Sequence, residues 1–200
     1  MNRPPGLQKL ALASGNPGKL REYEILASGH ELELQLLPRF AELPEFPEDA
    51  PTFAENAAGK ALYYSKYSDE IIFADDSGLV VAALGGAPGV LSARYAGPGA
   101  SSEQRNTKLL KELCGKIGLE RAAFFVCVIA IAQRGRCLAV VSGKVDGEIL
   151  ENPRGQGGFG YDPVFYCPIL GKSFAELSGE EKNQHSHRGK AFRRLMEIVE

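Results

Sequence analysis

The sequence predicts an α/β domain built on a mixed sheet, and three observations support this fold class. Apolar, strand-like segments alternate along the chain with amphipathic helical segments, which favours parallel strand pairs. Two long strand-like segments, 122–133 and 136–145, are joined only by Arg134-Gly135, which indicates an antiparallel hairpin. The length of 200 residues with 44% hydrophobic content suits one filled core rather than two independent domains. We therefore expect a single domain over residues 1–200.

The N-terminal part of the chain contains two strand-like segments and one helix. Segment 9–13 is a short apolar strand that leads through the loop 14–19 into a helix over 20–26. Segment 32–37 alternates weakly and is a second expected strand. The acidic, proline-punctuated loop 38–51 follows, and its length leads us to expect a function for it.

Capping patterns mark the beginnings of the next helices. Thr52 and Glu55 have the spacing of a capping box, in which the hydroxyl oxygen accepts from the third helical N–H and the glutamate reaches back to the cap. The helix is expected to continue to about Tyr67. Ser101 and Gln104 repeat the pattern before a leucine-rich helical segment.

The remaining segments complete the alternation. Segment 71–74 is a short apolar strand that we expect to end at 75–78, with 79–84 as its possible continuation. After the hairpin, 152–160 is a glycine-rich loop and 189–199 is a final helix.

Composition excludes several classes of function. A net charge of -2 gives no basic surface of the kind that nucleic-acid or membrane binding requires, so neither partner is expected. The four cysteines are widely spaced and contain no C-x-x-C pair, which argues against a zinc ribbon or a thioredoxin-type site. No apolar leader precedes the first strand, and the apolar run 122–132 is about half of the roughly 20 residues of a spanning helix. We expect a cytoplasmic protein.

The first candidate site is the segment Ser14-Gly15-Asn16-Pro17-Gly18-Lys19, between a strand and a helix. Free N–H groups and the helix dipole attract phosphate at such a position, and the lysine adds a positive charge. The segment is not a Walker A loop, because only two residues separate its glycines and a leucine follows the lysine. The alternative is an ordinary Gly-Pro turn that leads into a helix.

The second candidate site is the adjacent pair Asp75 and Asp76. Neighbouring carboxylates repel each other, and a bound hard cation is the simplest way to keep both ionised. An oxygen-only ligand set suits Mg2+, and Glu48 of the acidic loop could complete it. The alternatives are an Asp-rich turn with a capping carboxylate and a loop that is merely solvated.

The third candidate site combines an aromatic ring beside glycines with polar side chains from two later segments. A flat aromatic face can stack on a purine, and charged groups can hydrogen bond to the edge of the base. Taken singly, each residue could instead be a buried aromatic or a surface charge. The residues of this site are Phe159, Gly160, Tyr161, Asp162, Lys182, His187 and Arg188.

Together these segments resemble the inosine triphosphate pyrophosphatase family, whose motifs stand here as SGNPGK, TFAEN, DDSGL, LGGAPGVLSARYAG, GFGYDPVF, AELSGEEKN and SHRGKA. The match runs in order from about Leu10 to Leu195. The resemblance implies a magnesium-dependent enzyme that hydrolyses deaminated purine nucleotides, ITP, dITP and XTP, to the monophosphate and pyrophosphate and so removes them from the nucleotide pool. It also implies a long twisted mixed sheet flanked by helices, two lobes around a central cleft, and a homodimer.

The resemblance also implies roles for single residues. Ser14 to Lys19 would hold the phosphates, chiefly through Asn16 and Lys19, with help from Lys60. Glu48, Asp75 and Asp76 match the acidic positions around magnesium, Asp76 also matches the catalytic base, and Ser77 matches a nucleotide contact. Phe159 would stack on the purine, and the residues that read its edge would be Asp162, Lys182, His187 and Arg188.

Base choice follows from hydrogen-bond polarity. Hypoxanthine and xanthine carry a 6-keto acceptor where adenine carries an amino donor, so a site lined by the donors of Lys182 and Arg188 would reject adenine. Two alternative functions stay open: a Maf-like pyrophosphatase for modified pyrimidine nucleotides, and a non-catalytic purine nucleotide sensor.

Overall fold

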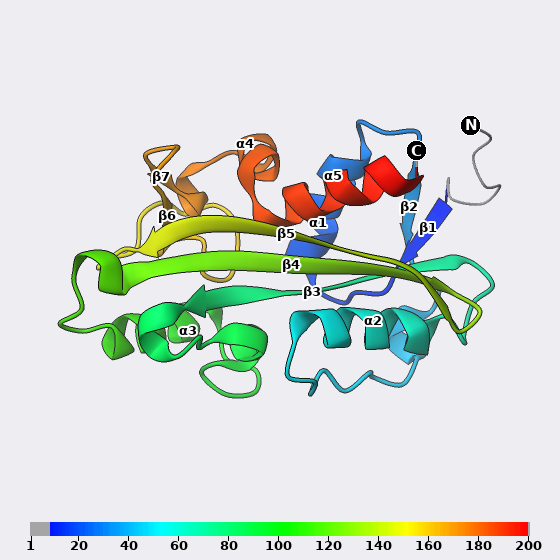
Figure 1. The fold of residues 1–200 in the computed structure, drawn as a ribbon, viewed down its shortest axis with the longest axis horizontal. Coiled ribbons are helices and arrows are strands. Elements are labelled where there is room, and N and C mark those ends of the chain that lie inside the picture. The colour runs from blue at the N-terminus through cyan, green and yellow to red at the C-terminus, as the bar shows by residue number, and fades with distance from the viewer. Residues whose placement is uncertain (1–8, 200) are drawn as a thin grey trace. The chain divides into compact units, whose positions relative to one another are not determined.

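The computed structural model describes residues 9–199 and confirms the mixed α/β fold (Figure 1). Seven strands form one sheet in the order β2-β1-β3-β4-β5-β6-β7. β1 pairs in parallel with β2 and β3, whereas the pairs β5–β6 and β6–β7 are antiparallel. Parallel and antiparallel pairs therefore coexist in one sheet, as the sequence predicts.

The strands are β1 (Lys9–Leu12), β2 (Glu33–Leu36), β3 (Ile71–Val81), β4 (Ala122–Gln133), β5 (Arg136–Ile149), β6 (Phe165–Cys167) and β7 (Lys172–Ser173). The α-helices are α1 (Pro17–Ala27), α2 (Phe53–Tyr64), α3 (Ser102–Glu112), α4 (Gly179–His185) and α5 (His187–Val199). The predicted hairpin between β4 and β5 is confirmed. Arg134 and Gly135 both have positive φ angles, 49° and 74°, and a two-residue turn needs such angles to match the twist of the two strands.

The structure differs from the sequence prediction at β3. This strand runs without a break through Asp75-Asp76-Ser77-Gly78, where we expected it to end. Cationic side chains that lie far away in the sequence contact Asp75, so the acidic pair does not force the backbone into a turn. The pair therefore lies inside a strand, and this placement decides where each carboxylate points.

The described contacts divide the chain into two compact units. The first contains the residues up to Asp76, Cys127–Gly143 and the residues from His187 on, and the second contains Ser77–Val126 and Lys144–Ser186. The long strands β3, β4 and β5 each contribute residues to both units, so neither unit is a continuous piece of the chain. A single domain over residues 1–200 stays a prediction.

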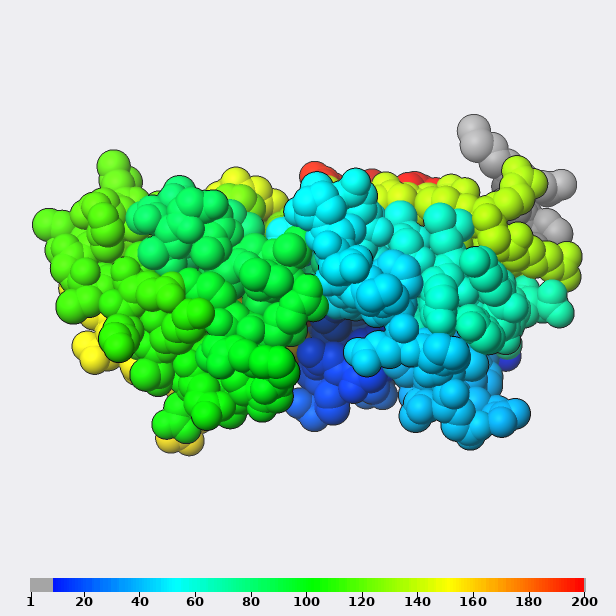
Figure 2. Space-filling model, turned by 90° about the horizontal axis from the view of Figure 1, so that it is seen from below, coloured from blue at the N-terminus to red at the C-terminus, as the bar shows by residue number. Residues whose placement is uncertain are grey.

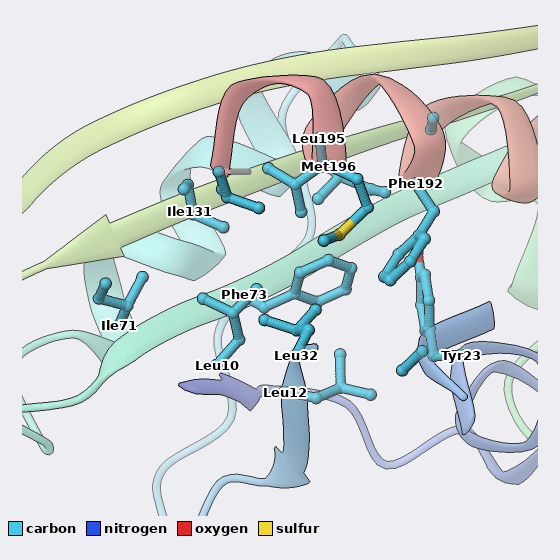
Figure 3. Close-up of a cluster of buried hydrophobic side chains, with 14 of the residues drawn as sticks. Leu10, Leu12, Tyr23, Leu32, Ile71, Phe73, Ile131, Phe192, Leu195 and Met196 are labelled. Atoms are coloured by element: carbon cyan, nitrogen blue, oxygen red, sulfur yellow. The ribbon is translucent and has the colours of Figure 1, made fainter. Parts of the chain in front are cut away.

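The core of the first unit lies between the sheet and the helices α1 and α5 (Figure 3). The rings of Tyr23 and Phe73 meet edge to face with centroids 4.8 Å apart, and Phe192 of α5 packs beside them. Because side chains alternate along a strand, the buried Ile72 and Ala74 point to the face opposite that of Phe73. Helix α2 lies on the other side of the sheet from α1 and α5 (Figure 1), and Figure 2 shows the molecule from that side. The first unit is thus covered by helices on both faces.

The core of the second unit is built around three phenylalanines. The ring centroids of Phe125 and Phe165 lie 4.6 Å apart, and those of Phe165 and Phe174 lie 4.9 Å apart. The buried guanidinium of Arg121 donates to the carbonyl oxygens of Ile149 (2.6 Å) and of Leu150 (2.7 Å). This residue therefore fixes the chain at the end of β5, just before the glycine-rich loop.

Gly143 provides a test of how α5 packs on the sheet. A β-carbon at this position would overlap the carbonyl oxygen of His187 and the backbone nitrogen of Ala191, neither of which can move without shifting the helix. We expect Gly143→Ala to lower the free energy of unfolding by about 1–3 kcal/mol or more, as overpacking does. Urea unfolding measures the loss, and Gly29→Ala is the matched control because a β-carbon there meets nothing within 4 Å. Equal stabilities of the two variants would contradict this packing.

Within residues 9–199, no helix combines the length and the apolar character that crossing a membrane requires.

Candidate active site

The predicted phosphate segment lies at the start of α1, and Asn16 is the helix cap. Its side-chain oxygen accepts from the N–H of Gly18 (2.9 Å) and from that of Lys19 (3.2 Å), while Pro17 occupies the first helical position. The sequence predicted that free N–H groups of this segment attract phosphate, but the structure shows that these two are already satisfied by Asn16. The positive charge available to an anion here therefore belongs chiefly to the Lys19 ammonium and the helix dipole.

Lys19 is bound to Asp75 through two oxygens. Its Nζ lies 3.0 Å from Oδ2 of Asp75 and 3.4 Å from the backbone oxygen of the same residue. The side chain of Lys19 is 13% exposed and that of Asp75 is 1% exposed. The phosphate segment and the acidic pair are thus neighbours in the first unit, which the sequence could suggest only through the family resemblance.

Asp75 and Asp76 point to opposite faces of β3, because successive side chains alternate along a strand. The Asp75 carboxylate lies on the face of α1 and α5, where its Oδ2 accepts from the Cys127 thiol at 3.7 Å. The Asp76 carboxylate lies on the face of α2, where its Oδ2 accepts from the amide of Asn56 at 3.0 Å. The two carboxylates therefore have different surroundings.

These surroundings separate the pKa values of the two residues. Burial raises the pKa of Asp76 to about 6, with the nearby Glu48 adding to the rise and Lys19 opposing it. Burial would also raise the pKa of Asp75, but the charges of Lys19 and Arg188 outweigh it and lower that pKa to about 2. Asp76 is therefore the carboxylate of the pair whose pKa lies closer to neutral pH, and burial is the main cause.

Lys60 connects the acidic loop to β3. It is 7% exposed, forms an ion pair with Glu48, and donates to the backbone oxygen of Asp75 at 3.0 Å. Burial alone lowers the pKa of Lys60, but Glu48 and Asp75 outweigh that effect and raise it. Lys60 is therefore positively charged, and the structure brings Glu48 to the same face of the sheet as Asp76.

Arg188 is buried at the start of α5, in the first unit. It is 1% exposed, forms an ion pair with Glu22 of α1, and places Nη2 3.6 Å from Oδ2 of Asp75. Burial lowers its pKa, but Glu22, Tyr23 and Asp75 raise it well above the usual value. The preceding His187 is 4% exposed. The structure thus places these two predicted base-reading residues in the unit that holds Lys19.

The other predicted base-reading residues lie together in the second unit. Asp162 and Lys182 form a buried ion pair, with exposed fractions of 3% and 4% for their side chains. Oδ2 of Asp162 also accepts from the N–H of Phe159 at 2.7 Å, and Nζ of Lys182 lies 4.8 Å from the centroid of the Phe159 ring. Asp162 thereby fixes both the loop that carries the ring and the cation beside that ring.

Helix α3 holds the same loop from its other side. Asn106 donates to the backbone oxygen of Gly160 at 3.1 Å, and the hydroxyl of Ser102 accepts from the Gly160 N–H at 3.2 Å. Tyr161 is buried, and its hydroxyl donates to the backbone oxygen of Ser92 at 2.9 Å. The structure therefore assigns Tyr161 to support of the loop, while Phe159 and Gly160 are partly exposed. Ser77 is also partly exposed, at the β3 position after the acidic pair.

Sequence reasoning missed several residues of this site. Asn56 stands within the quoted TFAEN motif, but no role followed from the motif itself. Glu22 and Cys127 carry no local signal, because only the fold brings them to Arg188 and Asp75. Asn106 also became recognisable only when α3 was placed against the loop.

The Asp162–Lys182 pair gives a stability prediction. Asp162→Ala leaves a buried ammonium without its carboxylate and removes the acceptor of the Phe159 N–H, so we expect a loss of about 3–5 kcal/mol in the free energy of unfolding. Asp146→Ala is the control, because the Lys144–Asp146 pair is exposed and contributes about 1 kcal/mol or less. Urea unfolding of both variants measures the difference, and similar losses would contradict the burial of the pair.

The donor chemistry of the first unit fits a hard divalent cation. Among residues 9–199, no group of three or more His, Cys, Asp and Glu side chains is arranged to hold a metal ion without further ligands. Glu48 and Asp76 offer carboxylate oxygens on the same face of β3, and the negative charge of Glu48 contributes to the raised pKa of Asp76. Two carboxylates completed by substrate phosphates are the usual surroundings of Mg2+ in nucleotide enzymes.

Comparison with known proteins agrees with the motifs and the fold. The model of the Ham1 family matches residues 10–198. A dITP/XTP pyrophosphatase of Geobacillus kaustophilus is 49% identical over 96% of this chain and 94% of the relative. One of Thermus thermophilus is 49% identical over 94% of this chain and 90% of the relative.

A solved structure supports the same assignment. The structure of a HAM1 protein from Coxiella burnetii has a TM-score of 0.85 with 40% identity and covers 96% of this chain and 98% of that protein. The family resemblance predicted from the motifs is therefore confirmed. From the family model, the relatives and the fold together, we conclude that this chain belongs to the Ham1 family.

Proposed function

We propose that this protein hydrolyses deaminated purine nucleoside triphosphates, ITP, dITP and XTP, to the nucleoside monophosphate and pyrophosphate. Water adds to the α-phosphorus, the bond from that phosphorus to the bridging oxygen breaks, pyrophosphate leaves, and one proton is released. The relatives that carry the name dITP/XTP pyrophosphatase support this substrate class. Removal of such nucleotides from the pool is the expected role in the cell.

The observation that carries the proposal is the combination of a phosphate-binding cation and a proton-accepting carboxylate in one unit. Lys19 stands at the N-terminus of α1, and the adjacent β3 carries Asp76, whose pKa burial raises to about 6 in the absence of a bound cation. A general base works best when its pKa lies near the working pH. We assign Asp76 as the base that orients and deprotonates the attacking water.

Mg2+ is the proposed cofactor, with Glu48 and Asp76 as the residues that would hold it. The bound ion would neutralise the charge of the phosphates and of the leaving pyrophosphate. Lys19 and Lys60 contribute further positive charge, and Ser14 and Asn16 fix the backbone at the start of α1, the helix that carries Lys19.

The family resemblance assigns the base of the nucleotide to Phe159, Asp162 and Lys182 of the second unit and to His187 and Arg188 of the first. In this assignment Phe159 would stack on the base, and the side-chain donors of Lys182 and of Arg188 would match a 6-keto oxygen. Adenine would oppose these donors with its amino group, and each unmatched buried donor costs about 1–3 kcal/mol. This difference supports selection of ITP over ATP.

We also propose a homodimer in the cytoplasm, as the family resemblance implies. Size-exclusion chromatography with light scattering tests the oligomeric state, and a mass of 21.6 kDa in solution would contradict the dimer.

The test of the proposed activity is a panel of triphosphates with Mg2+ in which pyrophosphate and orthophosphate are measured separately. We expect pyrophosphate from ITP, dITP and XTP, with rates at least about tenfold above those for ATP and CTP, as one or two unmatched donors allow. Turnover confined to modified pyrimidine triphosphates would favour the Maf-like alternative. Binding of ITP without release of pyrophosphate would favour the sensor.

A further inference from the structure

Asp75 is the most enclosed acidic group of the candidate active site. Its side chain is 1% exposed, and three cationic side chains from three different helices reach it. Lys19 of α1 and Arg188 of α5 approach its Oδ2, at 3.0 Å and 3.6 Å, and Lys60 of α2 donates to its backbone oxygen at 3.0 Å. All of these residues belong to the first unit.

The position of Asp75 in β3 separates it from the two carboxylates that fit a cation. Asp76 and Glu48 lie on the face of α2, whereas the Asp75 side chain points to the face of α1 and α5. Oδ2 of Asp75 is shared by an ammonium, a guanidinium and the Cys127 thiol.

We propose that Asp75 is a positioning residue that holds Lys19 and Arg188 through one carboxylate oxygen, and that it is not a ligand of the catalytic cation. This inference rests on the proposed function, in which Lys19 binds the phosphates and Arg188 reads the base. It replaces the metal-ligand role that the family resemblance predicts for Asp75.

The physical reason lies in the conformational entropy of Lys19 and in the carboxylate oxygen that it shares with Arg188. A lysine side chain has four rotatable bonds and loses much conformational freedom when it is ordered on a phosphate. Asp75 orders Lys19 before any anion arrives, so part of that entropy is lost on folding rather than on binding. Arg188 shares the same oxygen, and the structure therefore couples the proposed phosphate contact to the proposed base contact through one residue.

The first experiment measures metal binding without nucleotide. Mn2+ replaces Mg2+ as the probe, and its binding to the purified protein is measured by electron paramagnetic resonance. We expect Asp75→Asn to change the Mn2+ dissociation constant by less than about threefold and Glu48→Gln to raise it by about tenfold or more. A loss in Asp75→Asn as large as that in Glu48→Gln would overturn the proposal.

The second experiment measures nucleotide binding without turnover, with ITP in the presence of EDTA. We expect Asp75→Asn to raise the dissociation constant of ITP by about tenfold or more, because Lys19 and Arg188 lose their shared partner. An unchanged affinity for ITP would also overturn the proposal. Neither the Mn2+ affinity nor the ITP affinity depends on turnover. Wild-type protein that binds ITP but releases no pyrophosphate would therefore refute the proposed function and leave the role of Asp75 standing.

A double variant covers the case in which Asp75→Asn does not fold. Lys19→Met/Asp75→Asn removes the carboxylate together with its nearest cation, and Glu22 still pairs with Arg188. If Asp75 acts through Lys19, the double variant binds ITP within about threefold of Lys19→Met alone. A further loss of tenfold or more in the double variant would show that Asp75 contacts the nucleotide or its ion independently, which contradicts the proposal.

Discussion

Asp76→Asn is expected to abolish most of the activity and, in the absence of divalent cations, to stabilise the fold. The turnover of ITP should fall by about 10²–10⁴-fold, because the amide cannot accept the proton of the attacking water. The stability gain follows from the raised pKa of Asp76, about 6, since keeping this carboxylate ionised in the folded protein costs about 3 kcal/mol at most.

The pH dependence of the stability gain in Asp76→Asn shows whether the buried charge of Asp76 causes it. Because the folded pKa of Asp76 is raised, its protonated form stabilises the fold at low pH, and this contribution is lost as the pH rises through about 6. The asparagine variant does not titrate, so its advantage should be near zero at pH 3.8 and below and fully present above pH 6. Urea unfolding in EDTA at several pH values measures it.

Two results would contradict the role of Asp76. Turnover near the wild-type rate in a folded Asp76→Asn protein would refute its assignment as the base. A stability gain that is equally large at pH 4 and pH 8 would show that burial of a charge is not its cause. Glu45→Gln is the control, because this glutamate is exposed in the same acidic loop that carries Glu48.

Arg188→Ala is expected to destabilise the fold as strongly as Asp162→Ala does. The guanidinium is 1% exposed and neutralises Glu22 and part of the charge of Asp75. Removal of one partner of a buried pair costs about 3–5 kcal/mol, because Glu22 loses the charge of Arg188, while Asp75 keeps its contact with Lys19. The free energy of unfolding should therefore fall by that amount near pH 7.

A second substitution separates the loss of charge from the loss of packing. Arg188→Met with Glu22→Gln removes both charges and should recover at least half of the lost stability. Arg194→Ala is the matched control on α5, because this arginine is exposed. A deficit that the double variant does not reduce would contradict the ion-pair explanation.

Part of the site could be read from the sequence because its signals are local. The capping threonine at position 52 and the hairpin turn Arg134-Gly135 follow from backbone preferences of neighbouring residues, and the structure bears them out. The helix that we expected over 20–26 begins earlier, at Pro17 behind the cap Asn16. The end of β3 was predicted wrongly because the acidic pair was judged from its own charge, whereas Lys19 and Arg188 decide its conformation.

By itself, the sequence determined the alternation of strands and helices, the mixed character of the sheet and, through its motifs, the family. Only the tertiary structure decided that Asp75 lies inside β3 beside Lys19 and that Arg188 pairs with Glu22. The partners of these two ion pairs are 56 and 166 positions apart in the sequence, and the packing of helices on the sheet fixes their distances.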